Sequence, residues 1–173
     1  CTFCDQKSPK WRERSSKNFV DEIKINYEKY GIRDFDIYDS TFTANKKRVV
    51  EICDEIEKSG LDVGWTIRSR VDSVNEEVLH ALKRGGCHTI MYGIESSNPE
   101  ILKTLKKQIR PDKITKVINY THDLGIQMLG FFMLGAPGET IESMEDTIRF
   151  SLELPLEYAQ YAVVTPYPDT ELY

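Results

Sequence analysis

Two cysteines separated by two residues open the chain, in the segment Cys1-Thr2-Phe3-Cys4. This spacing lets both sulfur atoms face one metal centre, and thiolates are soft ligands that suit zinc or iron–sulfur clusters. Such a pair also occurs in zinc knuckles and in thioredoxin-like redox sites, so its meaning depends on the elements that follow it. We therefore take Cys1 and Cys4 as candidate metal ligands.

The other two cysteines are expected to be buried rather than reactive. Cys53 lies on the apolar face of a predicted helix, and Cys87 begins an apolar run, positions where cysteine behaves as a small hydrophobic residue. The histidines His80 and His88 could in principle complete a zinc site. Neither stands at a zinc-finger spacing from the first two cysteines, so the sequence does not favour this arrangement.

Composition and charge are those of an ordinary globular protein. The chain has 173 residues, of which 40% are hydrophobic and 29% charged, enough for one domain, residues 1–173, with a sizeable core. Its longest apolar stretch, 128–134, is far shorter than a membrane span, and no targeting segment precedes it. We therefore expect a cytoplasmic protein with no membrane contact.

The net charge of −5 argues against sequence-independent binding of nucleic acid, which needs clustered Lys and Arg. One basic run is present, comprising Lys103, Lys106, Lys107 and Arg110. We interpret this run as a helix end with a local anion contact.

Helical and strand patterns alternate along the whole chain. Strands are predicted over 34–39, 63–68, 89–95, 126–134 and 158–164, and helices are predicted to begin near residues 16, 45, 75, 98, 111 and 140. About five strand–helix repeats with no flexible linker indicate a parallel sheet with right-handed crossovers. An open doubly wound sheet and a (β/α) barrel both agree with this pattern.

Polar residues follow the predicted strands, where parallel α/β folds place their chemistry. Asp39, Arg68 and Glu95 each end a strand that has apolar neighbours. A carboxylate inside a barrel is costly unless something polar lies near it, so we take these three as candidate site residues. Arg70 and Ser96 are at least as well explained as ordinary polar loop residues.

Several segments together resemble the radical S-adenosylmethionine (SAM) superfamily. Within it they resemble the branch whose members often carry an upstream cobalamin-binding domain or act as methylthiotransferases. The matching segments are Cys1–Cys4, which resembles the second half of the C-x3-C-x2-C cluster loop, and residues 38–43, 92–96, 102–107, 130–140 and 165–170. They cover nearly the whole chain in the right order, and the combination is far more specific than any one segment.

The resemblance implies an α/β fold, a partial TIM-type (β/α)6 barrel of parallel strands whose first strand is missing here. Residues 1–173 would then be a radical SAM core domain that is incomplete at its N-terminus. The implied cofactors are a [4Fe–4S] cluster and SAM, with cobalamin bound only through an upstream domain. The implied activity is generation of a 5′-deoxyadenosyl radical that abstracts hydrogen from an unknown substrate, with electrons from a donor such as flavodoxin or ferredoxin.

Roles for single residues also follow from the resemblance. Cys1 and Cys4 would be two of three cysteine ligands of the cluster. For SAM, the methionine amino group would lie near Asp39, Ser40 and Thr41, the ribose or amino group at Glu95, and the carboxylate at Lys107. The adenine would lie near Phe3 and be lined by backbone around Leu134, Gly135, Ala136, Thr165 and Tyr167, and Arg68 is a further cofactor-binding candidate. The first cluster cysteine should stand four residues before Cys1. The chain as given is therefore expected to be inactive. Asp169, where the family usually has Gly, changes only one loop.

Two alternatives stay open at this point. The chain could be a zinc-binding or interaction module built on an α/β domain, with Cys1 and Cys4 as half of a zinc knuckle. It could also be an ordinary (β/α) barrel enzyme with Glu95 as general base and Arg68 as an anion clamp. Stoichiometric zinc without iron in the purified chain would support the first alternative. Activity that survives removal of Cys1 and Cys4 would support the second.

Overall fold

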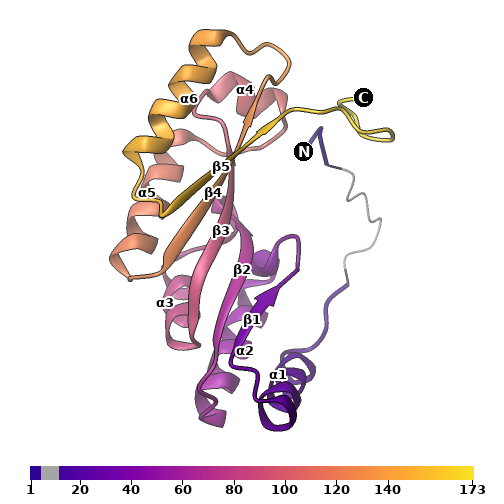
Figure 1. Ribbon diagram of the computed structural model, residues 1–173, viewed down its shortest axis with the longest axis vertical. Helices are drawn as coiled ribbons and strands as arrows, with labels where there is room; N and C mark the ends of the chain where they lie inside the picture. The colour runs from indigo at the N-terminus through magenta and orange to yellow at the C-terminus, as the bar shows by residue number, and fades with distance from the viewer. Residues whose placement is uncertain (5–11) are drawn as a thin grey trace.

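One sheet of five parallel strands forms the centre of the computed structural model, which describes residues 1–4 and 12–173. The strands are β1 (Asp34–Ile37), β2 (Gly64–Arg70), β3 (Cys87–Glu95), β4 (Gln127–Leu134) and β5 (Tyr158–Val163). They lie in sequence order, β1-β2-β3-β4-β5, and every pairing is parallel. A doubly wound sheet would reverse its strand order near the middle. The prediction of a partial barrel is therefore confirmed (Figure 1).

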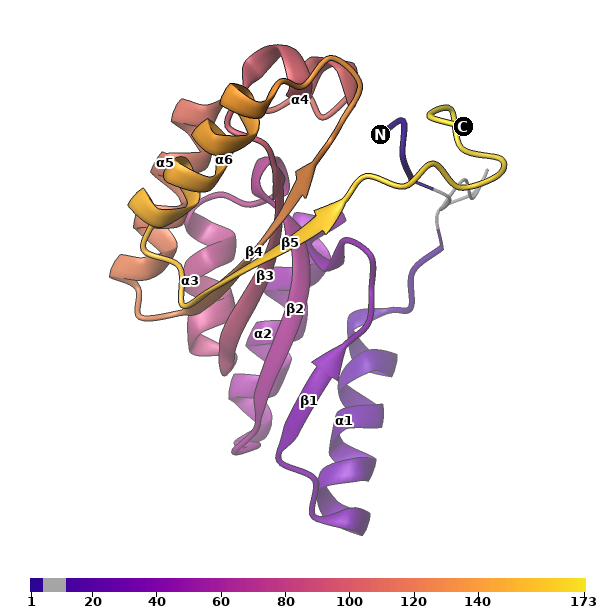
Figure 2. The same cartoon turned by 45° about the horizontal axis from the view of Figure 1, so that its top comes forward.

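Helices cover one side of this sheet and leave the other side open (Figure 2). They are α1 (Ser16–Tyr30), α2 (Lys46–Ser59), α3 (Glu76–Arg84), α4 (Pro99–Thr104), α5 (Pro111–Asp123) and α6 (Ile141–Glu153), with short 3-10 turns η1 (Phe42–Ala44) and η2 (Val71–Ser73). The helices α2 to α6 connect successive strands, and α1 packs beside α2. The layer arrangement thus gives each strand one covered face and one open face.

Local sequence signals set the ends of these helices. The side chains of Asn45, Asn75 and Asn98 accept hydrogen bonds from backbone N–H groups in the first turns of α2, α3 and α4. Gly31 and Gly60 end α1 and α2 in the left-handed conformation, which glycine adopts without a Cβ penalty. These caps explain why the helix boundaries could be predicted closely from the sequence.

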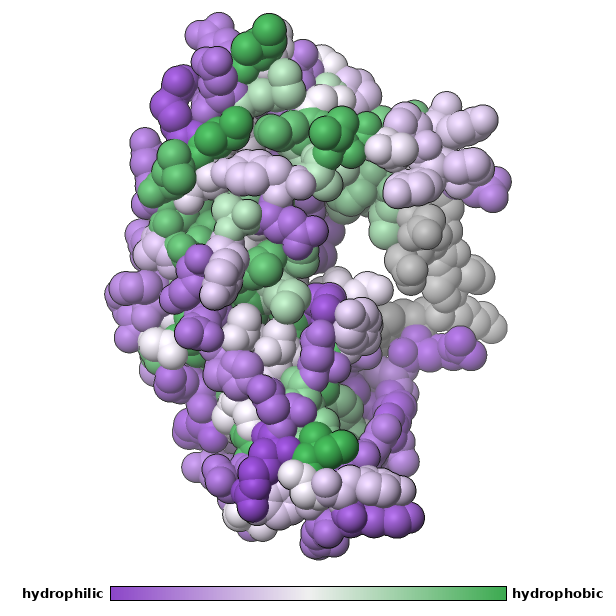
Figure 3. All heavy atoms as spheres, in the orientation of Figure 1, coloured by the Kyte–Doolittle hydropathy of each residue, from purple (hydrophilic) through white to green (hydrophobic). Residues whose placement is uncertain are grey.

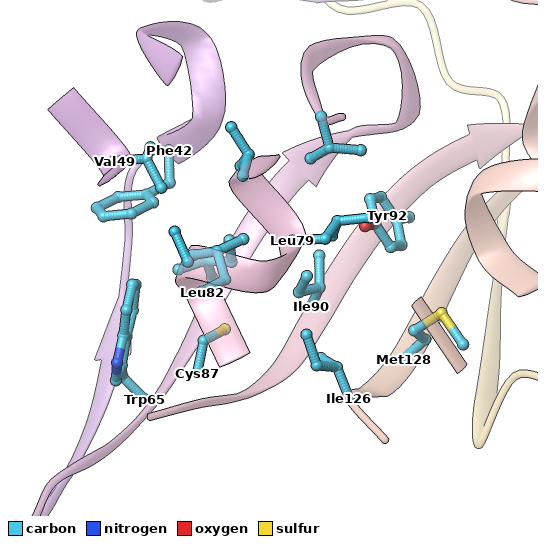
Figure 4. Packing of buried hydrophobic residues seen from close by; sticks show 14 of the residues in the cluster. Phe42, Val49, Trp65, Leu79, Leu82, Cys87, Ile90, Tyr92, Ile126 and Met128 are labelled. Carbon is cyan, nitrogen blue, oxygen red and sulfur yellow. The ribbon is translucent and has the colours of Figure 1, made fainter. Parts of the chain in front are cut away.

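The core lies between the sheet and the helices (Figure 4). Trp65 and Ile67 of β2, and Ile90 and Tyr92 of β3, are fully buried there. Each such side chain contributes about 1.5–3 kcal/mol through removal of apolar surface from water. Alternate residues on the same strands point to the open face instead.

Cys53 and Cys87 are both buried and free, which confirms their prediction as core residues. Burial raises the pKa of the Cys53 thiol to about 12, and it raises the pKa of the Cys87 thiol as well. A neutral thiol is a poor nucleophile and a poor metal ligand. These two side chains are therefore packing residues.

The second strand continues past the predicted end at Arg68 to Arg70. Burial alternates along β2, so that Thr66, Arg68 and Arg70 face the open side while Ser69 faces the helices. The predicted strand ended too early because charged residues at alternate positions near the end of a strand resemble the polar residues of a loop. As a result, Arg70 rather than Arg68 stands at the strand end.

The last strand is the most exposed part of the sheet. Every residue of β5 is exposed, including Tyr158 and Val163, and apolar surface gathers over β4, β5 and α6 in the space-filling view (Figure 3). Across the described ranges, no helix combines the length and the apolar character that a bilayer span requires.

Candidate cofactor site at the carboxyl ends of the strands

The first four residues lie at the rim formed by the carboxyl ends of the strands, close to the C-terminal segment (Figure 2). The backbone N–H of Thr2 donates to the carbonyl oxygen of Leu105 at 3.1 Å, and the carbonyl oxygen of Thr2 accepts from the N–H of Leu172 at 2.9 Å. These two bonds hold the cysteine segment between the end of α4 and the C-terminal segment. Cys1 and Cys4 are thereby brought to the rim.

Phe3 anchors the same segment through apolar contacts. It packs against a small cluster of Ile101, Leu105 and Ala136, which Val164 also joins. The cluster connects the cysteine segment to α4, to the turn after β4 and to the segment after β5. Phe3 and Ala136, both predicted to lie near the adenine, are therefore neighbours, while their contact with a nucleotide stays a prediction.

The two cysteines are free thiols joined by a tight turn. The N–H of Cys4 donates to the carbonyl oxygen of Cys1 at 3.5 Å; Cys1 is exposed and Cys4 is partly exposed. Two soft sulfur donors in one turn fit an iron–sulfur cluster or zinc. Within residues 1–4 and 12–173, no group of three or more His, Cys, Asp or Glu side chains is placed to hold a metal ion. Cys1 and Cys4 could therefore form part of the ligand set of a metal centre.

Neither histidine joins the cysteines. His80 is hydrogen bonded to the hydroxyl of Tyr120 at 2.9 Å, and His88 lies 3.0 Å from Asp34 near the amino end of β3. His88 is thus at the opposite end of the sheet from the cysteine segment. The zinc-module alternative gains no ligand from either side chain.

Arg70 extends from the end of β2 to the cysteine segment. Its Nη1 lies 3.6 Å from the Sγ of Cys1, within hydrogen-bonding distance for sulfur. Its Nε and Nη2 donate to the two carboxylate oxygens of Asp72 at 2.8 and 2.7 Å. Sequence reasoning missed Arg70 because the contact with Cys1 spans 69 positions and the predicted strand ended too early.

The pair formed by Arg70 and Asp72 shifts both pKa values in the direction that keeps both groups charged. The hydrogen bond from Arg70 to Asp72 raises the pKa of the guanidinium, against a smaller opposing effect of burial. For Asp72, burial favours a higher pKa, but the hydrogen bond and the charge of Arg70 together bring the pKa below its ordinary value. The rim thus holds a fixed positive group beside Cys1.

Glu95 and Lys107 form a buried ion pair next to this group. The Nζ of Lys107 donates to Oε1 of Glu95 at 2.6 Å, and only 4% and 10% of the two side chains are exposed. A Cβ atom at Gly93 would lie 2.7 Å from Nζ and 2.8 Å from Oε1, so a side chain there would have to displace one of the paired groups. Two residues predicted from separate motifs are therefore in direct contact.

The backbone of Glu95 adopts a positive φ of 72°. This left-handed conformation is uncommon for residues other than glycine and costs roughly 1–3 kcal/mol. Non-glycine residues held in this way cluster at functional sites. Glu95 is thus held at the end of β3 by its partner Lys107 against its backbone preference.

Asp39, Ser40 and Thr41 follow β1 and line a cleft of about 500 Å³, together with Arg70 and Ser73. The carboxylate of Asp39 is about half exposed. The cleft therefore lies beyond the ends of β1 and β2, and its lining mixes carboxylates such as that of Asp39 with guanidinium groups such as that of Arg70.

Arg68 does not reach the rim. Its guanidinium donates to both carboxylate oxygens of Asp36, at 2.7 and 3.2 Å, and stacks 3.9 Å from the ring centre of Tyr38. The hydrogen bond to Asp36 also raises the pKa of Arg68. This geometry places Arg68 in the open wall of the half-barrel with its charge neutralised, which weakens the anion-clamp alternative.

The turn after β4 is fixed by its own glutamate. One carboxylate oxygen of Glu139 accepts from the N–H groups of Gly135 and Ala136 at 2.6 and 2.8 Å, and the carbonyl of Leu134 accepts from Val164 at 2.9 Å. After β5, the hydroxyl of Thr165 donates to the carbonyl of Val163 at 3.3 Å, and Tyr167 is exposed. The predicted adenine-lining segments, 134–136 and 165–167, are thus adjacent through the Leu134–Val164 bond.

The basic run on α4 and the loop after it forms ion pairs with carboxylates of the chain. Each cation is paired with a carboxylate of the chain: Lys103 with Glu100, Lys106 with Glu171, Lys107 with Glu95 and Arg110 with Asp112. Their charges are thereby neutralised locally. The local anion contact expected for this run stays a prediction, and each of its cations already has a carboxylate partner.

Comparison with known proteins agrees with this geometry. The model of the Radical SAM superfamily matches residues 1–151. An uncharacterized methyltransferase of Pyrococcus horikoshii is 42% identical over 176 residues, which cover 100% of this chain and 38% of the relative. The anaerobic magnesium-protoporphyrin IX monomethyl ester cyclase of Rubrivivax gelatinosus is 28% identical over 178 residues, covering 100% of this chain and 32% of that protein. The chain thus spans about a third of the length of these curated relatives.

Solved structures share the fold. The radical SAM methyltransferase TsrM from Kitasatospora setae, solved with cobalamin and a [4Fe-4S] cluster bound, matches with a TM-score of 0.91 at 20% identity, over 99% of this chain and 36% of that one. Coproporphyrinogen III oxidase HemN from Escherichia coli, a radical SAM enzyme, matches with a TM-score of 0.73 at 17% identity, over 97% and 42%. From its motifs, its fold and the match over most of its length, the chain belongs to the radical SAM superfamily.

Proposed function

We propose that this chain is the core of a radical SAM enzyme that binds a [4Fe–4S] cluster and SAM at the carboxyl-end rim. The observation that carries the proposal is the position of Cys1 and Cys4. Backbone bonds to Leu105 and Leu172 hold their segment beside the candidate SAM residues. Sulfur donors and a polar cleft thereby share one edge of the sheet.

Cys1 and Cys4 would supply two thiolates to the cluster, and a third would come from outside this chain. When bound and reduced, the cluster and SAM supply a 5′-deoxyadenosyl radical, which is the chemistry of the cofactors rather than of the protein. Because two thiolates are too few ligands, residues 1–173 alone are expected to be inactive. In the whole protein, a flavodoxin or ferredoxin is the proposed electron donor, and cobalamin would bind through another domain.

The chain's own contribution is to bind and orient SAM. Lys107 has three N–H donors, and its bond to Glu95 leaves donors for the carboxylate of the methionine group. The second oxygen of Glu95 is left for a ribose hydroxyl or the amino group, and the half-exposed carboxylate of Asp39 is a further acceptor for the amino group. Phe3 and the turn after β4 would enclose the adenine.

The open face of the half-barrel would border the substrate. Next to β3 and β4 this face carries the partly buried apolar side chains of Met91, Leu129, Phe131 and Met133, whereas β1 and β2 contribute Asp36 and Arg68. An apolar wall near the site keeps water from a reactive carbon-centred species. The proposed reaction is hydrogen abstraction from a substrate that lies along this wall.

The test is anaerobic reconstitution of the longer protein that contains this chain, followed by reduction and assay for 5′-deoxyadenosine. Formation of this product, and its loss in Cys4→Ala, is the expected result. Glu95→Gln, whose amide oxygen can still accept from Lys107, should lower SAM affinity while the iron content stays unchanged. The proposal is wrong if the wild-type protein gains no iron–sulfur absorbance and cleaves no SAM; stoichiometric zinc would then favour the zinc module.

A further inference from the structure

We propose that Arg70 and Thr2 set the reduction potential of the cluster held by Cys1 and Cys4, by donating hydrogen bonds to its sulfur atoms. This inference rests on the proposed function, since it needs a cluster at the rim. Neither the guanidinium of Arg70 nor the hydroxyl of Thr2 takes part in the proposed binding of SAM. Both groups lie within or against the cysteine segment.

Arg70 is held so that one donor nitrogen faces the cysteine. Its Nε and Nη2 are occupied by Asp72, while Nη1 lies 3.6 Å from the Sγ of Cys1. The backbone carbonyl of Arg70 accepts from the hydroxyls of Ser69 and Ser73 at 3.1 and 2.8 Å. Side chain and backbone are therefore both fixed, and the direction of Nη1 follows from these contacts.

Thr2 supplies the second donor. Only 7% of the residue is exposed, and its hydroxyl has no hydrogen-bond partner among the described residues. Its backbone is fixed on both sides by Leu105 and Leu172. A buried hydroxyl without a partner costs roughly 1–3 kcal/mol. Thr2 lies in the same turn as Cys1 and Cys4, and we assign a cluster sulfur as the acceptor for its hydroxyl when the metal is bound.

Donors of this kind change how easily a cluster is reduced. Reduction adds one negative charge, which spreads over the sulfur atoms of the cluster and its ligands. A hydrogen bond or a nearby positive group stabilises this reduced form more than the oxidised form, and so raises the reduction potential. Loss of either donor should therefore make the cluster harder to reduce.

The experiment is a redox titration of the reconstituted full-length protein, followed by electron paramagnetic resonance, without SAM. Thr2→Val removes the hydroxyl at nearly constant shape, and Thr2→Ser keeps it. Arg70→Gln removes the guanidinium. Arg84→Gln is the matched control, because Arg84 pairs with Asp54 and Glu57 on the surface of the helix layer.

We expect Thr2→Val and Arg70→Gln to shift the midpoint potential to more negative values, while Thr2→Ser and Arg84→Gln leave it at the wild-type value. Unchanged potentials in Thr2→Val and Arg70→Gln, with intact clusters, would overturn the inference and leave the proposed function standing. If Arg70→Gln assembles no cluster, the result for Thr2→Val decides. Absence of a cluster in the wild type would instead refute the proposed function.

Discussion

The side of the sheet that faces the helices is packed with apolar groups such as Trp65 and Ile90, whereas the rim is built from charged groups such as Arg70, Glu95 and Lys107. Apolar contacts in the core are shared among many neighbours, and hydrophobic swaps that keep the volume are tolerated there. Each rim contact joins two particular groups, and removing one leaves the other without a partner. The rim should therefore be more sensitive to single substitutions.

The largest expected effect is at the buried ion pair. Lys107→Met leaves the carboxylate of Glu95 buried and unpaired, so we expect a loss of about 3–5 kcal/mol in the free energy of unfolding. Urea denaturation of the chain measures it. Lys103→Met is the control, because the pair with Glu100 is exposed and contributes at most about 1 kcal/mol. Equal losses in the two variants would remove the contrast between rim and surface.

The rates at which the four thiols react with a reagent should differ between the core and the rim. Burial raises the pKa of Cys53 to about 12 from an ordinary 9.0, which lowers its thiolate fraction at pH 8 about 10³-fold. Cys1 and Cys4 should react quickly with a disulfide reagent, and Cys53 and Cys87 only after unfolding. Four fast thiols in the native chain would contradict the buried positions of the latter two.

Two glycines test how each region accepts an added methyl group. At Gly130, a Cβ would meet apolar side-chain atoms of Leu156, Phe132 and Ile94 at 2.8–3.1 Å, and none of these atoms takes part in an ion pair. At Gly93, it would meet both members of the buried pair. We expect Gly130→Ala to cost about 1 kcal/mol and Gly93→Ala about 3 kcal/mol, the two ends of the usual range for overpacking. Denaturation midpoints of both variants check this order.

The smallest expected effect is on the stability of the fold at acid pH. The pKa of Asp72 lies below its ordinary value of 3.8 in the folded state, so its pairing stabilises the fold above that value and is lost as the pH falls through the lower, folded-state pKa. Stability should therefore fall less steeply in Asp72→Asn than in the wild type below about pH 4. Identical acid profiles in the two proteins would show that Arg70 contributes nothing through this carboxylate.

Much of the fold could be predicted because local patterns carry it. Alternation of apolar residues located the strands, and Asn45, Asn75 and Gly60 marked helix ends. Contacts at the rim lack such a local pattern. Glu95 was found as a carboxylate at the end of an apolar strand and Lys107 through a resemblance to family motifs, but their ion pair was not predicted.

Arg70 was missed for a physical reason. The sequence shows only a charged residue after another charged residue of the same strand, and its contact with Cys1 exists only when the chain closes over 69 positions. Arg68 was chosen instead because it ends the predicted strand. The structure places Arg68 against Asp36 and Tyr38, within the wall rather than at the rim.

The most direct test of the central claim is the iron content of the reconstituted full-length protein and its cysteine variants. We expect roughly four irons per chain in the wild type, as a [4Fe–4S] cluster requires, with loss of iron in Cys1→Ala and Cys4→Ala. Cys53→Ala and Cys87→Ala should keep the cluster, because both thiols are buried in the core. Iron that persists without Cys4, or disappears with Cys53, would contradict a cluster at this rim.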